Sequence, residues 1–307
     1  MRELCCVVNP AAARGGARRV WPRVQALLQE RGVSFSARFT QAPGHATDLV
    51  RSALREGCET ILVVGGDGTV NEAVNGFFEG GRNISPDAKL AVVPKGTGTD
   101  FSRSLGLPRE LPVLVDTILQ ARSRQIDVGM LRCRSADGAP VERCFINIAD
   151  LGYGGALLDR VNGFTKFLGG FLAYLTGMLY TLVFYDNQPI SFRVDEGEVQ
   201  QGVYNAVIVA NGQYFGGGMW IAPGARLDDG CFEIVLVGDV SKAEVVRNLP
   251  KIYRGTLSEH DKVQVLSGRK LEVWSDERVL LDADGELPGQ LPAVFELLPA
   301  ALQVCSV

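Results

Sequence analysis

Residues 63–77, VVGGDGTVNEAVNGF, place three glycines and one aspartate where an apolar run ends and a helical pattern begins. A turn between a strand and a helix directs several backbone N–H groups toward one point, and the start of the helix adds partial positive charge. The glycines at 65, 66 and 68 admit positive φ values and let oxygen atoms approach the backbone closely. These features indicate a turn that binds phosphate.

Asp67 lies among these amides, where its charge would repel a bare phosphate. Its presence is explained by a metal ion beside it, or by a hydroxyl group whose proton it accepts. A structural explanation is equally open for this turn alone, since Asp-Gly is a common turn dipeptide. In that case Asp67 would cap a helix that begins near Val70.

Two further turns have the same character. NPAAARGGARR places Asn9 at a strand end and Arg14 in a short cationic loop, the kind that binds phosphate oxygens. PKGTGTDF, residues 94–101, is a Gly/Thr turn ahead of a short helix, with Asp100 as a cap or a substrate contact. A solvated basic helix start would account for the first loop taken singly. Three such turns together favour a nucleotide site.

The elements that position these turns alternate between strand and helix. The predicted strands are residues 4–8, 33–39, 60–64 and 89–93, and the predicted helices are residues 17–30, 46–55, 70–78 and 111–120. Such alternation predicts right-handed βαβ units and a parallel sheet covered on both faces. Ligands bind at the carboxyl ends of the strands in such folds, where all three turns fall.

After residue 140 the pattern changes to closely spaced strands with alternating apolar residues, among them ISFRVDEGEV and RVLLDADGE. A period of two predicts an antiparallel sandwich or barrel. A chain of 307 residues is also long enough for two domains. We therefore expect an α/β domain with a parallel sheet over residues 1–130 and a β-rich antiparallel sandwich over residues 131–307.

Composition excludes some classes of function. The net charge of −4 argues against a nucleic-acid binder with a broad basic face. The seven cysteines show no CxxC and no spacing paired with histidine, so we expect buried thiols in a reducing compartment rather than a zinc site. The amino-terminal apolar run is too short for a signal peptide, which favours a cytoplasmic protein.

Residues 167–185 carry no charged side chain and meet the length criterion for a membrane span. A single crossing would put the glycine turns and the late DADGE sequence on opposite sides of the membrane. We therefore expect no transmembrane span, but a helix packed in the second domain or lying at a membrane surface. Together with the small-residue loops 151–155 and 214–220 it could bind lipid, although core packing is the alternative.

These residues resemble the diacylglycerol kinase catalytic family, which includes bacterial lipid kinases and the sphingosine and ceramide kinases. The matching motifs are NPAAARGG, GGDGTVNE, PKGTGTDF, IDVG, NGQYFGGGMWIAPGARLDDG and DADGE. They occur in order from about residue 4 to residue 300. The resemblance implies a fold like that of NAD kinase and phosphofructokinase, with ATP in the cleft between two domains. It also implies transfer of the γ-phosphoryl group to the hydroxyl group of diacylglycerol or a related lipid.

The resemblance also implies site residues. Nucleotide contacts fall on Asn9, Arg14, Thr40, Gly65, Gly66, Asp67, Gly68, Thr69, Asn71, Glu72 and Thr97. A structural magnesium site falls on the carboxylate of Asp229 and the carbonyls of Arg226 and Cys231, with Asp127 tied to it or to the substrate. The family usually has Asn where this chain has Thr99, and some relatives have an acidic residue in place of Arg226. The second departure weakens the expected magnesium site.

The resemblance places a catalytic acid in the DGE sequence, Asp284 to Glu286. Residues at i and i+2 of a strand or tight turn point the same way, so Asp284 and Glu286 could face one site together. We expect one of them to be the general base, with Asp67 on the metal ion of the nucleotide. An ordinary acidic β-turn is the alternative for this sequence.

Two rival functions remain open. One is a kinase of a soluble substrate, such as NAD kinase or phosphofructokinase, and the other is a non-catalytic lipid or nucleotide sensor. As partners we expect ATP, Mg²⁺ and a lipid substrate at the membrane surface, without nucleic acid. The enzyme would be associated peripherally with the membrane, and a homodimer is one arrangement to test.

Overall fold

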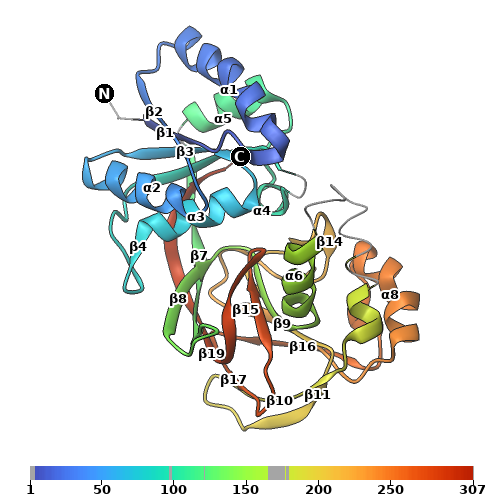
Figure 1. Ribbon diagram of the computed structural model, residues 1–307. Helices are drawn as coiled ribbons and strands as arrows, with labels where there is room; N and C mark the ends of the chain where they lie inside the picture. Colours follow the sequence, from blue (N-terminus) through green and yellow to red (C-terminus); the bar gives the residue numbers. More distant parts are fainter. Residues whose placement is uncertain (1–3, 97–98, 121, 165–176, 178–179, 307) are drawn as a thin grey trace. The chain divides into compact units, whose positions relative to one another are not determined.

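The chain divides into two units, and two strands, β7 (Ser123–Arg134) and β19 (Glu286–Cys305), have residues in both (Figure 1). A computed structural model describes residues 4–96, 99–120, 122–164, 177 and 180–306. Unit 1 comprises Met1–Val128 and Leu298–Val307, and unit 2 comprises Gly129–Leu297. The sequence placed the boundary near residue 130 but predicted no return of the chain to the first unit.

Unit 1 is built on a parallel sheet with the strand order β2-β1-β3-β6-β19. Its strands are β1 (Leu4–Val8), β2 (Phe35–Phe39), β3 (Thr60–Gly65) and β6 (Lys89–Pro94), joined by the last residues of β19. Gln303 and Val304 of β19 pair in parallel with Lys89 and Leu90. The central strands are apolar runs because both faces of the sheet are covered.

Helices cover both faces of this sheet (Figure 1). The helices of unit 1 are α1 (Ala12–Glu30), α2 (His45–Arg55), α3 (Asp67–Phe77), α4 (Asp100–Ser104) and α5 (Leu111–Leu119). Helices α1 and α5 share one core with strand residues such as Val8, Leu62 and Val93, whereas α2 and α3 pack together on the other side. The predicted α/β domain with a parallel sheet is therefore confirmed.

Unit 2 is rich in antiparallel strands, as predicted. They are β8 (Pro140–Phe145), β9 (Ile148–Gly152), β10 (Gln188–Val194), β11 (Gln200–Tyr204), β12 (Ala206–Ala210), β15 (Phe232–Val237), β16 (Val263–Gly268), β17 (Lys270–Trp274) and β18 (Leu280–Ala283). One path runs β16-β15-β12-β9-β18-β19, while β10 pairs with β11 and β17. The core includes Phe145 and Phe232, whose rings stack with centroids 5.6 Å apart.

Three features of unit 2 differ from the sequence-based description. ISFRVDEGEV is not one strand but part of a hairpin, because its acidic residues form the turn between β10 and β11 and Asp195 adopts a φ of 49°. Helices α6 (Tyr153–Phe164) and α8 (Lys242–Arg254) were not predicted. Strand β19 continues far beyond the predicted segment AVFELLP.

Most of the uncharged segment, residues 167–176, 178 and 179, lies outside the described residues. Within the part of the chain that the structure does describe, no helix combines the length and apolarity needed to cross a membrane.

Candidate functional site

In unit 1 the predicted nucleotide residues gather at the carboxyl ends of the parallel strands. Asn9 follows β1, Thr40 follows β2, Gly65 ends β3 and Lys95 follows β6. The backbone continues the ladder here, because the amides of Asn9 and Thr40 donate to Val64 and Val8 and the Lys95 amide donates to Gly65. The strand order therefore brings turns that are far apart in sequence to one edge of the sheet.

Asn9 joins the first turn to the GGDG turn. Its Nδ2 donates a hydrogen bond to Thr69 Oγ1 at 2.8 Å, and its Oδ1 accepts one from the amide of Ala11 at 3.1 Å. Thr69 is buried and packs so closely on Gly65 that a Cβ there would lie 2.7 Å from its side chain. Asn9, Gly65 and Thr69 thus form one group in contact, and packing against Thr69 alone requires a glycine at position 65.

The GGDG turn also meets the turn after β6 through bare backbone. A Cβ added to Gly96 would lie 2.9 Å from the Cα of Gly66, a separation that real Cβ atoms do not show. These two glycines allow the strand-end turns to touch. Thr97, the next predicted nucleotide residue, lies outside the described residues.

Asp67 does not cap its own helix. It is the first residue of α3, which begins at Asp67 rather than near Val70, and its Oδ2 accepts the amide of Asp100 at 3.2 Å. Burial raises the pKa of Asp67, while the amides of Asp100, Phe101 and Thr99 and the charge of Arg103 oppose that shift. The carboxylate therefore joins the GGDG turn to the start of α4.

The remaining nucleotide candidates of unit 1 differ in their surroundings. Arg14 is exposed and lies in a run of positive φ values from Ala13 to Gly15 that interrupts α1. Such strain persists where the surrounding structure imposes it and is frequent at binding sites. Asn71 is fully buried. The two carboxylate oxygens of Glu72 accept the amides of Gly44 and Ala46, so they hold the start of α2.

In unit 2 the side chain of Asp284 is enclosed by backbone amides. Its Oδ1 accepts from Asn147 and Ile148 at 3.0 Å each, and its Oδ2 accepts from Ile146 at 2.8 Å. Its own amide donates to the carbonyl of Ile148 at 2.9 Å, and its φ of 52° places it in the left-handed region. This carboxylate fixes the turn to the segment that enters β9.

Glu286 has a different environment from Asp284. It is exposed, begins β19 and lies opposite Ala283 across the turn. The amide of Gly285 donates to Asp282 Oδ1 at 2.7 Å, so two buried or half-buried aspartates brace the turn that presents Glu286.

No motif in the sequence predicts a buried acid pair beneath this turn. Asp150 of β9 and Asp282 of β18 are direct cross-strand partners, with 2% and 9% of their surfaces exposed. Burial raises the pKa of Asp150 to about 7, against a smaller opposing effect of the nearby Gly155 amide. Burial and the neighbouring charge of Asp150 raise the pKa of Asp282. Only the strand register brings these residues together, and a motif search cannot detect it.

The predicted magnesium residues do not form a side-chain cage. Asp229 Oδ1 accepts the amide of Cys231 at 3.2 Å, and Arg226 lies 3.5 Å from Asp228. Asp127, which belongs to unit 1, accepts the amide of Ala300 at 2.7 Å. Across the residues that the structure covers, no three acidic, histidine or cysteine side chains group in a way that would hold a metal ion. The predicted site uses one carboxylate and two main-chain carbonyls rather than three such side chains, so it stays a prediction.

The family comparison divides the chain in a similar way to the fold. Residues 3–131 match the model of the diacylglycerol kinase catalytic domain, and residues 148–306 match the model described as the YegS C-terminal NAD kinase beta sandwich-like domain.

Relatives with known names align with nearly the whole of this chain. A diacylglycerol kinase of Staphylococcus carnosus is 32% identical, with 97% of this chain and 93% of that protein covered. One of Staphylococcus haemolyticus is 30% identical, with coverages of 100% and 89%.

Solved structures agree with the fold. A diacylglycerol kinase from Bacillus anthracis superposes with a TM-score of 0.74 at 22% identity, covering 100% of this chain and 97% of that one. An NAD kinase from Archaeoglobus fulgidus, solved in complex with ATP, gives a TM-score of 0.51 at 14% identity and covers 98% of this chain and 93% of that one.

Proposed function

The chain belongs to the diacylglycerol kinase catalytic-domain family and is a kinase, and from this premise we propose that it transfers the γ-phosphoryl group of ATP to a hydroxyl group of a lipid. Diacylglycerol or a related lipid is the proposed acceptor. Catalysis takes place at the surface of a membrane, with which the enzyme associates peripherally from the cytoplasm.

The observation that carries the proposal is the meeting of glycine turns in unit 1. The backbones of Gly66 and Gly96 approach so closely that a Cβ on Gly96 would lie 2.9 Å from the Cα of Gly66, beside the start of α3. The first amides of a helix have no partner within it and carry partial positive charge, which suits phosphate oxygens. In the proposed complex these amides bind the phosphate chain.

Side chains around these turns complete the proposed nucleotide site. The exposed guanidinium of Arg14 binds phosphate oxygens, and the Asn9–Thr69 hydrogen bond keeps the first turn against the GGDG turn. Asp67 holds α4 against the same turn and lies where the phosphates would bind. Magnesium enters as part of the ATP substrate, where it neutralises phosphate charge. We assign no step to a metal ion held by the protein alone.

We assign the general base to Glu286 rather than Asp284. Three backbone amides already occupy the oxygens of Asp284, whereas Glu286 is exposed on the turn that Asp282 and Asp284 brace. A base must reach the hydroxyl proton as the oxygen attacks phosphorus. The proposed proton path therefore runs from the lipid hydroxyl to the carboxylate of Glu286.

A transfer assay tests this function. The protein is incubated with ATP labelled in its γ-phosphate and with diacylglycerol, sphingoid base, phosphatidylglycerol or NAD, and the products are separated by chromatography. Label in a lipid product, lost in the Asp67→Asn variant, is the expected result. Transfer to NAD alone would favour a kinase of soluble substrates, the activity named for the Archaeoglobus fulgidus structure. No transfer to any acceptor would favour a non-catalytic sensor.

A further inference from the structure

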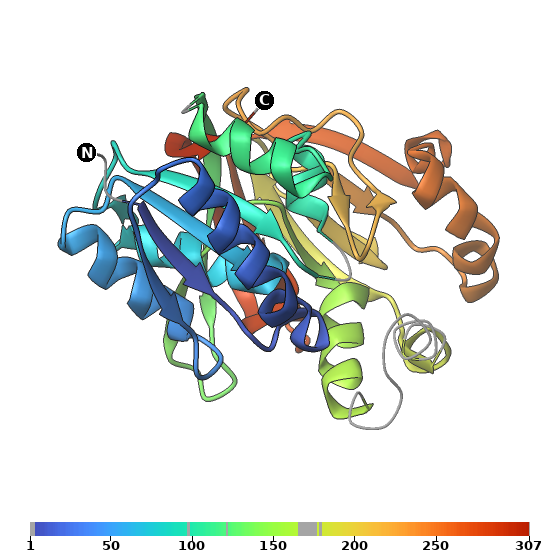
Figure 2. The same ribbon diagram turned by 90° about the horizontal axis from the view of Figure 1, so that it is seen from above.

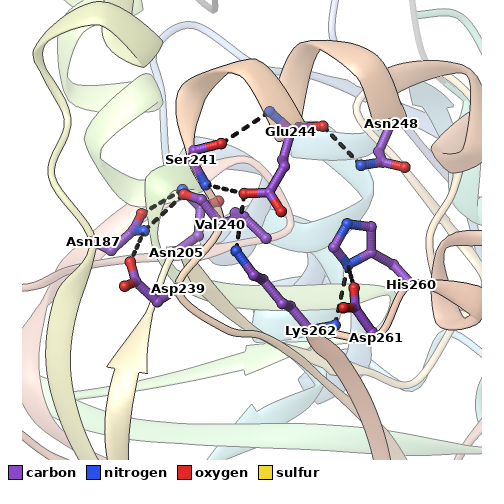
Figure 3. A network of polar contacts seen from close by, with 10 residues as sticks. All are labelled: Asn187, Asn205, Asp239, Val240, Ser241, Glu244, Asn248, His260, Asp261 and Lys262. Carbon is purple, nitrogen blue, oxygen red and sulfur yellow. Dashed lines mark hydrogen bonds and ion pairs between the residues drawn. The ribbon is translucent and has the colours of Figure 1, made fainter.

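Helix α8 of unit 2 is firmly attached at its amino-terminal end. The Ser241 hydroxyl accepts the amide of Glu244 at 3.3 Å, and Glu244 Oε2 accepts the amide of Ser241 at 2.7 Å, which is a capping box. Lys262 Nζ donates to the same Glu244 oxygen at 3.0 Å (Figure 3). The amide and the hydroxyl of Ser241, together with Lys262, lower the pKa of Glu244 to about 2. The only carboxylate of this helix therefore makes its contacts at the amino-terminal end of the helix.

The residues that lead into α8 are held as well. Asn187 Nδ2 donates to Asp239 Oδ1 at 2.7 Å and to the carbonyl of Val240 at 2.9 Å, and Asn205 donates to Asn187 (Figure 3). At the other end Gly255 takes the left-handed conformation that commonly closes a helix. This helix is therefore a fixed part of unit 2.

Despite this attachment, no residue of α8 is buried. Its inner face is half-buried, and Ile252 packs against a core cluster that contains Ile208 and Leu257. Its outer face presents Val246 and Tyr253, each 49% exposed, although both are large and apolar. An amphipathic helix normally turns such residues toward the protein core. Their exposure on α8 therefore suits contact with an apolar environment outside the protein.

The same outer face is basic. Lys242, Arg247 and Arg254 are exposed: Arg247 and Arg254 lie seven residues apart and directly follow Val246 and Tyr253, and Lys242 lies one turn before Val246. The helix therefore has an excess of positive charge, on a chain whose net charge is −4. Charge of this sign is concentrated where the apolar side chains are exposed.

More apolar surface adjoins the start of α8. Lys242 Nζ donates to the carbonyl of Val183, and Val183 and Phe184 are 59% and 58% exposed. In both views this segment lies beside α8 (Figures 1 and 2). The acidic side chain on this stretch is Asp186, whose carboxylate lies 3.9 Å from Lys242. We call Val183, Phe184, Lys242, Val246, Arg247, Tyr253 and Arg254 the α8 face.

We propose that the α8 face is the surface by which this protein docks on an anionic lipid bilayer. Exposed aromatic and aliphatic side chains enter the boundary between headgroups and acyl chains, while arginine and lysine bind the lipid phosphates. A globally acidic protein is repelled by an anionic surface unless positive charge is concentrated on part of its own surface, and the exposed face of α8 has such a concentration. The inference rests on the proposed function, because a kinase of lipids must meet its substrate at a bilayer.

Vesicle co-sedimentation tests the docking surface. The full chain is mixed with vesicles of phosphatidylcholine alone, and with vesicles that also contain phosphatidylglycerol. Wild-type protein should bind the anionic vesicles more tightly, and added salt should weaken this binding. Arg247→Gln combined with Arg254→Gln should weaken anionic-vesicle binding about 25-fold, at about fivefold for each basic residue. Arg23→Gln combined with Arg109→Gln removes the same charge from exposed sites elsewhere and should leave binding unchanged.

Activity toward a short-chain lipid dispersed in detergent separates this inference from the proposed function. The Arg247→Gln, Arg254→Gln variant should phosphorylate dispersed lipid as wild type does, because its two altered residues lie outside the proposed catalytic machinery. Failure of wild type to phosphorylate any lipid would overturn the function itself. Two outcomes would overturn the docking surface alone, provided that wild type phosphorylates lipid fully. In one, wild type and the Arg247→Gln, Arg254→Gln variant bind anionic vesicles equally well; in the other, wild type does not bind anionic vesicles.

Discussion

Two Asp-Gly turns, Asp67–Gly68 in unit 1 and Asp284–Gly285 in unit 2, have the same dipeptide but different surroundings. Asp67 accepts the amide of Asp100, is stabilised in its charged form by the amides of Phe101 and Thr99 as well, and is buried enough for its pKa to be raised. Asp284 accepts three amides through its two oxygens. Both carboxylates accept backbone amides, so neither the dipeptide nor the amides alone say which aspartate acts in chemistry and which only holds its turn. Variants at the two turns can separate these roles.

The largest expected effect comes from Asp67→Asn. We expect kcat to fall about 10³-fold, because an amide keeps an acceptor for the start of α4 but loses the charge beside the proposed phosphate site. Steady-state kinetics with the lipid acceptor, together with the thermal midpoint, measure this. Asp87→Asn, an exposed acid in the same unit, is the matched control. Retention of most activity would make Asp67 a structural clamp as well.

The second change, Glu286→Gln, tests the base on the other turn. We expect kcat to fall about 100-fold with an unchanged thermal midpoint, because the side chain is exposed and the proposed role is proton transfer. Full activity in this variant would remove Glu286 from the mechanism.

Asp284→Asn, in contrast, should act mainly on stability. The NH₂ group of an asparagine would face backbone donors that now share two carboxylate oxygens, leaving at least one amide unsatisfied. We expect a loss of about 1–3 kcal/mol in the free energy of unfolding, measured with urea. Asp276→Asn is an exposed control in the same unit. A large loss of kcat at unchanged stability would instead assign the proton transfer to Asp284.

Much of the fold could be predicted because its signals are local. The β-branched runs at residues 4–8 and 60–64 are β1 and most of β3, and the glycine turns end parallel strands as expected. Helix α8 also had a local signal, Ser241 followed by Glu244, that the strand pattern around it obscured.

The details of the candidate site depend on contacts between distant residues. The amides that hold Asp284 come from residues 146–148, and Asp150 meets Asp282 only through the register of β9 and β18. A one-residue slip would turn either aspartate to the other face of the sheet. Sequence motifs could therefore point to this turn as a candidate site but not predict the contacts that its carboxylates make.

The effect of the buried pair beneath the second turn depends on pH, and its sign is the clearest of the four. Because the pKa of Asp150 is raised in the folded chain, the folded state binds its proton more tightly than the unfolded state does. Its contribution to stability is therefore complete below about pH 4, falls by up to about 1.4 kcal/mol per pH unit and is lost by about pH 7. The raised pKa of Asp282 acts in the same direction.

Asp150→Asn should reduce this dependence of stability on pH. Urea unfolding between pH 5 and 7 should show that the free energy of unfolding of the variant rises relative to that of wild type as pH rises, while Asp276→Asn follows wild type. A constant difference between Asp150→Asn and wild type across this range would mean that Asp150 is already ionised in the fold.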